Sequence, residues 1–418
     1  MREKLKLYYC CRFTQLSPLR LSGGKNDRTD NDLMLDSRGL PMIPGSALAG
    51  VLRGRLTREE ANLLFGRDTV GDAMTESAVL VGDAALPADA KVRFTHRDGV
   101  GLDKHKVAVK GAKYDFETAE CTAPYTAVIE WSGWSDDPAL PLLDDLLAGA
   151  AADGLAFGGR TTRGYGRMAA EIHKKVFHFP ADLDAWLAFD PDTADAFADA
   201  DAVAGRETVP QENVLCAELR MTGSFIVRRY TSDVAVDEDK SGPDYCALEN
   251  GNGRPVLPGT GWAGAFRHHM RAMLDEMGGT AQQKADVNAL FGYSDDGVLK
   301  KRSALAFDET EISGGQAYTL TRNALDRFTA GTASKALYTS CVQQGGQGTL
   351  TIRLRRGALD VFQRQLLGAA LLDLDRGYLT VGGENSVGRG RATITALTLN
   401  GYPLQKEDLL HALTEVEK

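Results

Sequence analysis

The chain contains two copies of one sequence pattern, and this repeat limits the folds that it can adopt. The segment 41–46, Pro-Met-Ile-Pro-Gly-Ser, is matched by the segment 255–260, Pro-Val-Leu-Pro-Gly-Thr. This match lies 214 residues later, and other landmarks recur in the same order 223 to 226 residues later. They are 62–66 and 288–292, 101–104 and 324–327, 158–167 and 382–391, and the strand-like segments 168–176 and 392–399. Such self-similarity is typical of a repeated structural unit. The sequence therefore predicts two domains of one fold.

The length of 418 residues suits two domains better than one. A stretch rich in alanine and aspartate separates the copies and predicts a linker. The expected divisions are a first domain at 1–180, an acidic linker at 181–211, a second domain at 212–402 and a C-terminal tail at 403–418.

Each copy combines strand and helix patterns. Residues 5–9 and 215–219 alternate or run apolar, as strands do, whereas 46–56 and 260–274 place apolar residues on one helical face. A second helix is expected at 141–151 and at 359–374. This order predicts an α+β fold, with two tandem ferredoxin-like sheets that carry helices on one face.

Composition narrows the class of protein. Hydrophobic residues make up 43% and charged residues 25%, which indicates a packed globular core. The apolar runs are too short to cross a membrane, and no apolar signal region follows Met1, so a cytoplasmic location without a membrane partner is expected. The six cysteines are scattered and are interpreted as reduced thiols rather than a zinc site.

The glycine-rich segments are the main candidates for binding. Residues 164–169, Gly-Tyr-Gly-Arg-Met-Ala, fit the dinucleotide pattern, but a strand follows where that pattern needs a helix. A glycine loop also lets a polyanion lie against backbone N–H groups, and arginines at its edges can pair with phosphates. These arginines are Arg160, Arg163, Arg167, Arg389 and Arg391. The alternative is a hairpin that only turns the chain.

Two further features adjoin these loops. Ser46 and Thr260 are expected to cap helices whose positive ends attract anions, although capping alone explains both residues. Acidic residues precede each helix and could hold Mg²⁺ beside a phosphate-binding surface, or form a solvated loop. They are Asp27, Asp30, Asp32 and Asp36 in the first copy, and Asp237, Glu238, Asp239 and Asp244 in the second.

These motifs together resemble the RAMP superfamily of CRISPR-associated proteins. The resemblance lies in the Gly-Leu-Pro-Met-Ile-Pro-Gly-Ser segment at 39–46, the Leu-Asp-Arg-Phe-Thr element at 325–329 and the closing glycine-arginine loops. It is greatest to the backbone subunits of type III effector complexes, and it covers nearly all of both copies.

The resemblance implies a modified RNA-recognition-motif fold in each copy and a thumb-like hairpin that kinks a guide–target duplex. In active members, an aspartate six residues before a second acid cleaves target RNA with a divalent metal. That spacing selects Asp30, with Asp36 as the second acid. In the second copy Glu249 is expected to match Asp36, so the place of Asp30 falls on Pro243, with Asp244 and Asp239 as nearby candidates.

The expected function is therefore a guide RNA-binding subunit that cuts complementary target RNA alongside other CRISPR effector subunits. Mg²⁺ or another divalent cation is expected at Asp30. The expected RNA-binding residues are Ser46, Arg53, Lys104, Lys106, Gly159, Arg160, Arg163, Gly164, Gly166, Arg167, Thr260, Arg267, Arg327, Gly383, Gly388, Arg389, Gly390 and Arg391.

Three alternatives remain open. The protein can be a non-catalytic scaffold with inert acidic loops. It can instead be a nuclease that processes the guide precursor with His105, His268 or His269 as general acid or base. A third alternative, an enzyme acting on a small nucleotide, requires a closed pocket. The net charge of −9 does not by itself favour nucleic-acid binding, but basic residues are concentrated around the glycine segments.

Overall fold

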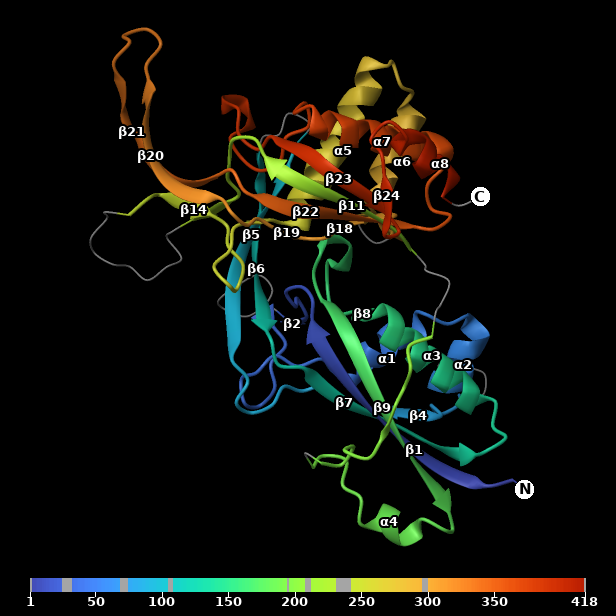
Figure 1. Cartoon of the computed structure of the whole chain (residues 1–418). Coiled ribbons are helices and arrows are strands. Elements are labelled where there is room, and N and C mark those ends of the chain that lie inside the picture. Colours follow the sequence, from blue (N-terminus) through green and yellow to red (C-terminus); the bar gives the residue numbers. More distant parts are fainter. Residues whose placement is uncertain are drawn as a thin grey trace. The chain divides into compact units, whose positions relative to one another are not determined.

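The computed structural model describes residues 2–24, 32–67, 74–103, 108–193, 195–206, 212–230, 242–294 and 300–416 (Figure 1). The fold is mixed α and β, as expected. The chain divides into two compact units, of which the first contains residues 1–99, 114–161 and 165–210 and the second contains the rest. Of the helices in the described ranges, none combines the length and apolar character needed to cross a bilayer.

The first unit is built on an antiparallel sheet with the central strand β1 (Lys4–Gln15). Alternate residues of β1, such as Leu5, Leu7 and Tyr9, point into the core, as the period of a strand requires. The strand order is β10-β9-β1-β7-β4, with β8 paired to β9. These strands are β10 (Asp201–Ala202), β9 (Arg167–Phe179), β7 (Tyr125–Trp134), β4 (Val79–Val81) and β8 (Leu155–Ala156).

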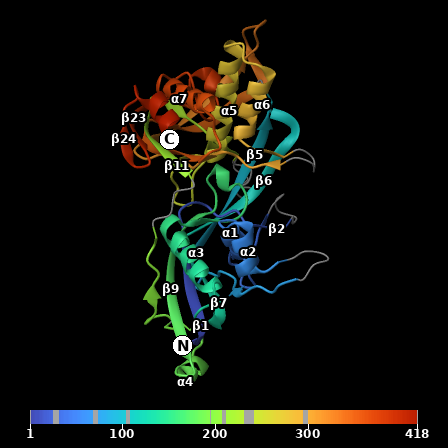
Figure 2. The same cartoon turned by 90° about the vertical axis from the view of Figure 1, so that its right-hand side faces the viewer.

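Three helices bury their apolar sides against this sheet. They are α1 (Gly45–Arg53), α2 (Arg58–Phe65) and α3 (Ala139–Asp153), and Figure 2 shows α3 beside β9. Leu48 of α1, Leu64 of α2 and Leu147 of α3 are almost completely buried in the same core as β1. The helices therefore cover one face of the sheet.

The segment expected as an acidic linker contributes to the first unit. It contains α4 (Leu183–Leu187) and β10. The Phe189 ring packs 4.8 Å from that of Tyr8, and Trp186 Nε1 donates to the Tyr8 hydroxyl at 3.0 Å. Because even-numbered residues of β1 face away from the helices, this segment covers part of the opposite face of the sheet.

The second unit repeats the plan around β11 (Glu212–Met221), in the order β18-β22-β11-β23-β24. The other strands are β18 (Leu305–Phe307), β22 (Gln347–Arg355), β23 (Ala392–Leu399) and β24 (Tyr402–Leu404). The helices are α5 (Gly259–Glu276), α6 (Ala281–Leu290), α7 (Val361–Asp375) and α8 (Leu409–Glu415). Residues 403–418, expected as a tail, include α8, whose Leu409 and Leu413 belong to the core.

The two units have the same chain order and strand neighbours. In each, the central strand lies between the strand that follows the glycine loop, β9 or β23, and the strand that precedes α3 or α7, which is β7 or β22. The second helices, α2 and α6, both begin with a capping box, at Thr57 and Thr280. Equal topology and equal local signals indicate one fold in two copies.

Each half of the sequence also contains a long two-stranded hairpin. The first is β5 (Val92–Leu102) with β6 (Ala108–Cys121), and the second is β20 (Gln316–Leu325) with β21 (Thr332–Gln344). We call these hairpins the arms; the second projects away from the helices of its unit (Figure 1). The remaining short strands are β2 (Ser22–Gly24), β3 (Asp32–Leu33), β12 (Ser224–Phe225), β13 (Arg228–Tyr230), β14 (Tyr245–Ala247), β15 (Val256–Leu257), β16 (Tyr293–Ser294), β17 (Lys300–Lys301) and β19 (Thr310–Glu311).

One local expectation is wrong. Pro44 and Pro258, rather than Ser46 and Thr260, occupy the N-cap positions of α1 and α5, and neither helix has a side-chain cap. In α1 the carboxylate of Asp83 accepts the Gly45 N–H at 2.7 Å instead. The positive end of α1 therefore already has an internal anion.

The packing predicts that a change of phenylalanine to alanine lowers the stability of the second unit by different amounts at two positions. Phe266 is completely buried in the core, whereas Phe328 at the tip of the arm is 83% exposed. Phe266→Ala should lower the free energy of unfolding by about 3–5 kcal/mol, because it leaves a cavity. Phe328→Ala should change it by about 0.5 kcal/mol or less. Urea unfolding of both variants measures this difference, and equal losses would contradict the assigned core.

Candidate functional site

Both glycine segments dock against a neighbouring backbone in the same way. The N–H of Gly159 donates to the carbonyl of Arg20 at 2.8 Å, and the N–H of Gly383 donates to that of Ile226 at 2.7 Å. A Cβ on the preceding glycines, Gly158 and Gly382, would lie 2.1 and 2.6 Å from those same carbonyl oxygens. Only glycine fits there, so the spacing of the motif has a steric cause.

The next residue in each loop has a left-handed backbone. Arg160 has φ 61° and Glu384 has φ 57°, and short 3-10 turns follow, η1 (Thr161–Arg163) and η3 (Asn385–Val387). Non-glycine residues rarely adopt this conformation. The shared geometry makes Arg160 and Glu384 structural counterparts with opposite charges.

In the first unit the loop arginine lies on aromatic rings of the arm. The Arg160 guanidinium lies 4.4 Å from the centre of the Tyr114 ring and 5.3 Å from that of Phe116. Its Nη1 donates to the Tyr114 hydroxyl at 2.5 Å. Arg20 lies 4.7 Å from the same Phe116 ring. Two guanidinium groups therefore contact one aromatic ring.

The charges of Arg20 and Arg160 are not balanced by any residue in the described part of the chain. Among the residues that the structure describes, no carboxylate forms an ion pair with either arginine, and the buried Nε of Arg20 has no hydrogen-bond partner. Burial and the neighbouring charge of Arg160 lower the pKa of Arg20. Nearby, Arg97 does face an acid, with its Nη2 3.8 Å from Glu120.

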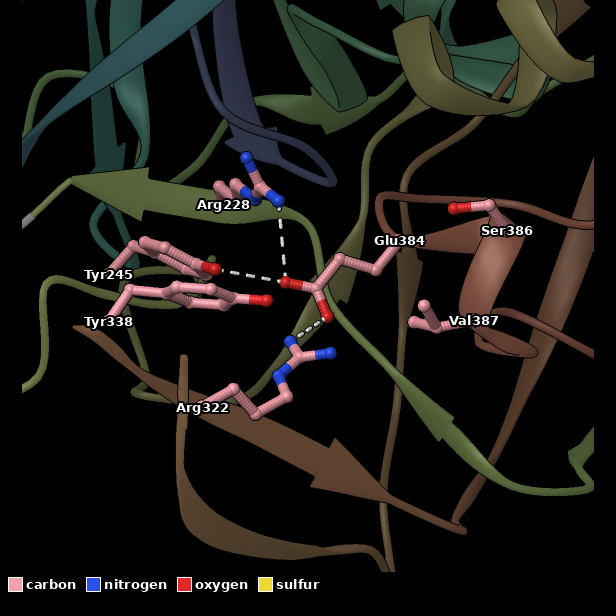
Figure 3. Close-up of a pocket in the computed structure, with 7 residues that line it drawn as sticks. All are labelled: Arg228, Tyr245, Arg322, Tyr338, Glu384, Ser386 and Val387. Carbon is pink, nitrogen blue, oxygen red and sulfur yellow. Dashed lines mark hydrogen bonds and ion pairs between the residues drawn. The ribbon is translucent and has the colours of Figure 1, made fainter. Parts of the chain in front are cut away.

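In the second unit Glu384 is surrounded by donors (Figure 3). Its Oε1 accepts from Tyr245 at 3.0 Å and from Arg228 at 3.3 Å. Its Oε2 accepts from Arg389 at 2.7 Å and also from Arg322. Burial alone would raise the pKa of Glu384, but these hydrogen bonds lower it to about 2. The carboxylate is therefore a fixed negative charge among three arginines.

Glu384 and its neighbours Tyr245, Arg228 and Arg322 line an open pocket of about 490 Å³ together with Tyr338. Arg228 lies 4.5 Å from the Tyr245 ring and Arg322 lies 5.1 Å from the Tyr338 ring. Figure 3 shows the two tyrosines side by side, with their hydroxyls directed toward Glu384. The remaining lining residues are Ser386 and Val387 of η3.

Several expected RNA-binding arginines have structural contacts. Arg53 donates to the Asn62 side chain at 3.0 Å, which joins α1 to α2, and Arg267 donates to Asn288 at 3.2 Å, which joins α5 to α6. Arg389 is only 5% exposed and contacts Glu384.

The other expected binding residues differ in exposure. Arg391, Arg327, Ser46 and Gly388 are exposed, whereas Gly164, Gly166 and Gly390 are buried. Arg163, Arg167, Gly159, Gly383 and Thr260 are partly exposed. Lys104 and Lys106 lie outside the described residues.

Asp36, the expected second acid, builds a turn. Its carboxylate accepts the backbone N–H groups of Arg38 and Leu40 at 2.8 and 3.0 Å, and these bonds, that of Leu40 foremost, lower its pKa. In the second unit Asn250 accepts the N–H groups of Asn252 and Arg254, both at 3.0 Å. The same turn thus exists in both units.

This turn corrects the alignment of the acidic segments. Asn250, and not Glu249, is the counterpart of Asp36. The residue six places before Asn250 is Asp244, so the six-residue spacing selects Asp244 and not Pro243 in the second copy. Glu249 and Asn250 both resemble an aspartate, so the sequence alone does not decide between them.

Asp244 is exposed beside the arm. Its carboxylate accepts the Thr339 N–H at 2.7 Å, and its own N–H donates to the Thr339 carbonyl at 2.8 Å. Asp27, Asp30, Asp237, Glu238 and Asp239 lie outside the described residues. The described ranges contain no cluster of three or more histidine, cysteine or acidic side chains placed to hold a metal.

One histidine of the guide-processing alternative has a structural contact. The His269 Nε2 lies 2.8 Å from Asp373 Oδ2, so this ring joins α5 to α7. His268 is partly exposed on α5, and His105 lies outside the described residues.

The tip of the second arm is shaped by Asp326. Its carboxylate accepts the N–H groups of Phe328 and Thr329 at 3.0 and 2.8 Å. Arg327 lies 4.9 Å from the exposed Phe328 ring. The tip therefore presents an apolar ring and a cation on a defined turn.

Sequence reasoning did not select Arg20, Tyr114, Phe116 or Glu384 as site residues. The available signal was the residue that follows each Gly-Gly pair, which differs in charge between the copies. The strand and arm partners of that residue are distant in sequence, so its contacts can be identified only in the folded structure.

Comparison with known proteins identifies the family to which the chain is similar. The family model of the RAMP superfamily matches residues 12–169 and 234–393, one region in each half of the chain. No curated protein matches. Among solved structures, a chain of the type III-B Cmr-beta assembly in the apo state is 12% identical, with 40% of this chain and 96% of that chain covered and a TM-score of 0.33. A chain of the same assembly bound to cognate target RNA is 11% identical, with the same coverage and a TM-score of 0.31.

The contacts of Glu384 predict a pH-dependent stability. Its folded pKa of about 2 lies below the ordinary value of 4.5, so its charge stabilises the fold above about pH 4.5. That contribution is lost as the pH falls toward 2. Glu384→Gln should therefore lower the Tm at neutral pH, and the difference from wild type should shrink during acidification. The exposed Glu407→Gln is the control, and a difference that persists in acid would exclude the charge as its cause.

Proposed function

Because the chain belongs to the RAMP superfamily through both of its halves, we propose that it is a guide RNA-binding backbone subunit of a type III CRISPR effector complex. The observation that carries the proposal is the repetition of the family pattern, each time with a glycine loop and a long arm. The motif resemblance to type III backbone subunits supports the choice of complex. Such a subunit works with other effector subunits and with complementary target RNA in the cytoplasm.

The strand order supports a ferredoxin-like fold, related to the RNA-recognition motif, in each unit. In both sheets the first strand of the repeat is central: β1 lies between β7 and β9, and β11 lies between β22 and β23. RNA-recognition domains use such sheets and adjoining loops to hold single strands. The glycine loops, the exposed Arg391 and the arms supply the basic and aromatic groups that this binding needs.

The tip of the second arm supports the thumb role. An exposed aromatic ring next to an arginine can stack on bases and pair with phosphate. Phe328 and Arg327 provide this pair, and Asp326 holds their turn. In this proposal the tip inserts where the guide–target duplex is kinked.

Asp30 and Asp244 are the proposed catalytic residues for target cleavage. The turn geometry supports their equivalence, and Asp244 is exposed, as contact with RNA requires. Each carboxylate would orient the attacking hydroxyl and accept its proton. Asp36 would act as a positioning residue, because its carboxylate is engaged in the turn. Asp239 is the remaining candidate of the second copy.

The donor set fits a sparsely coordinated divalent cation. Mg²⁺ in nucleic-acid enzymes keeps several waters and takes one or two carboxylates together with phosphate oxygens. An exposed aspartate next to bound RNA can supply the protein ligand. When bound, Mg²⁺ would stabilise the charge on the phosphate during cleavage.

Experiments can distinguish two other functions from this one. A non-catalytic scaffold would bind guide and target without cutting. A guide-processing nuclease based on histidine would cut in the presence of a chelator, whereas aspartate and metal chemistry would be chelator-sensitive.

We predict that each aspartate controls a different cut. Labelled complementary RNA is incubated with the purified complex and Mg²⁺, with chelator as the control. Asp30→Ala should remove one product and Asp244→Ala another, while guide and target binding persist. Asp239→Ala should retain both products. If the double variant of Asp30 and Asp244 cuts as wild type does, neither aspartate is catalytic and the activity lies elsewhere in the complex.

A further inference from the structure

The two glycine loops carry opposite charges on the same backbone frame. Arg160 and Glu384 both follow a Gly-Gly pair, both have a left-handed φ, and both precede a 3-10 turn. Their arm neighbours also correspond. In the first unit Leu19 forms a β-bridge with Ala119, and Tyr114 lies five residues before Ala119. In the second unit Phe225 pairs with Gln343, and Tyr338 lies five residues before Gln343.

In the second unit an internal carboxylate neutralises part of the arginine cluster. Glu384 accepts hydrogen bonds from Arg228, Arg322 and Arg389, and its side chain is only 7% exposed. Arginine pairs well with carboxylate and phosphate alike, because both present planar or near-planar oxygen pairs to the guanidinium fork. The Glu384 carboxylate thus provides the kind of anion that a phosphate would provide.

In the first unit the described residues supply no such anion. Arg20 and Arg160 lie over one Phe116 ring, and no described carboxylate pairs with either. Two like charges in a half-buried position repel each other. The pKa of Arg20 is lowered first by its burial and then by the charge of Arg160. Binding one anion between them would relieve the repulsion.

We propose that Arg20 and Arg160 bind a phosphate group of RNA, and that Glu384 is a built-in substitute for this phosphate in the second unit. The two loops are then unequal: the first takes its anion from the ligand and the second contains its own. The identity of the ligand as RNA rests on the function proposed above, whereas the preference for a phosphate rests on the arginine geometry alone.

The first test uses inorganic phosphate and the full-length chain. Phosphate should raise the Tm of wild type, because a ligand that binds the folded state stabilises it. Arg160→Ala and Arg20→Ala should remove this rise. Glu384→Gln should enlarge it, because the second arginine cluster then lacks its internal anion. Circular dichroism checks the folding of each variant, and Arg160→Lys serves if the alanine variant does not fold.

The second test measures the affinity for a single-stranded RNA of mixed sequence at several salt concentrations. Arg160→Ala should lower the slope of log K against log salt by about 0.7, the value for one lost phosphate contact. Arg160→Glu, which copies the second unit, should weaken binding further. The variant Arg254→Ala, at an exposed ion pair with Glu311, is the control for a lost surface charge.

Distinct outcomes separate this inference from the proposed function. If Arg389→Ala lowers the slope as much as Arg160→Ala does, both loops pair with phosphate and the asymmetry is wrong. If RNA binds but neither Arg20 nor Arg160 affects the slope or the phosphate effect, the inference fails and the proposed function stands. If wild type binds no RNA while phosphate still stabilises it through Arg20 and Arg160, the anion site stands and the RNA function fails.

Discussion

The close approach of each glycine loop to a neighbouring backbone is the constraint on which both sites depend. At Gly158 and Gly382 there is no space for a side chain beside the carbonyl groups of Arg20 and Ile226. This contact fixes the loop, which in turn holds the following residue in a left-handed conformation and directs its side chain to the arm. The chemistry of each site is then decided by one residue on a rigid support.

Much of the fold could be predicted from the sequence, because its signals are local and repeated. The repeat, the central strands and the long helices follow from spacing and periodicity. The role of 181–206 could not be read in the same way. Its many aspartates suggest a solvated linker, but a few aromatic residues, such as Phe189, decide its packing against Tyr8.

The site was less predictable, because its contacts join distant segments. Arg389 is an arginine in a glycine loop, and only its burial next to Glu384 distinguishes it from a phosphate ligand. The match of Asp244 to the first copy depends on a turn, which aspartate builds at position 36 and asparagine builds at position 250. Residue identity alone does not reveal that equivalence, whereas the matching hydrogen bonds of Asp36 and Asn250 do.

The covalent fusion of the two units has a consequence for how such a protein can evolve. If identical subunits assembled from one short gene, a change of arginine to glutamate would appear at every position of the assembly at once. In this chain the change affects one loop and leaves the other intact. The peptide bond also sets the ratio and the order of the unlike units, so no selective interface is needed to keep an arginine-type unit next to a glutamate-type one.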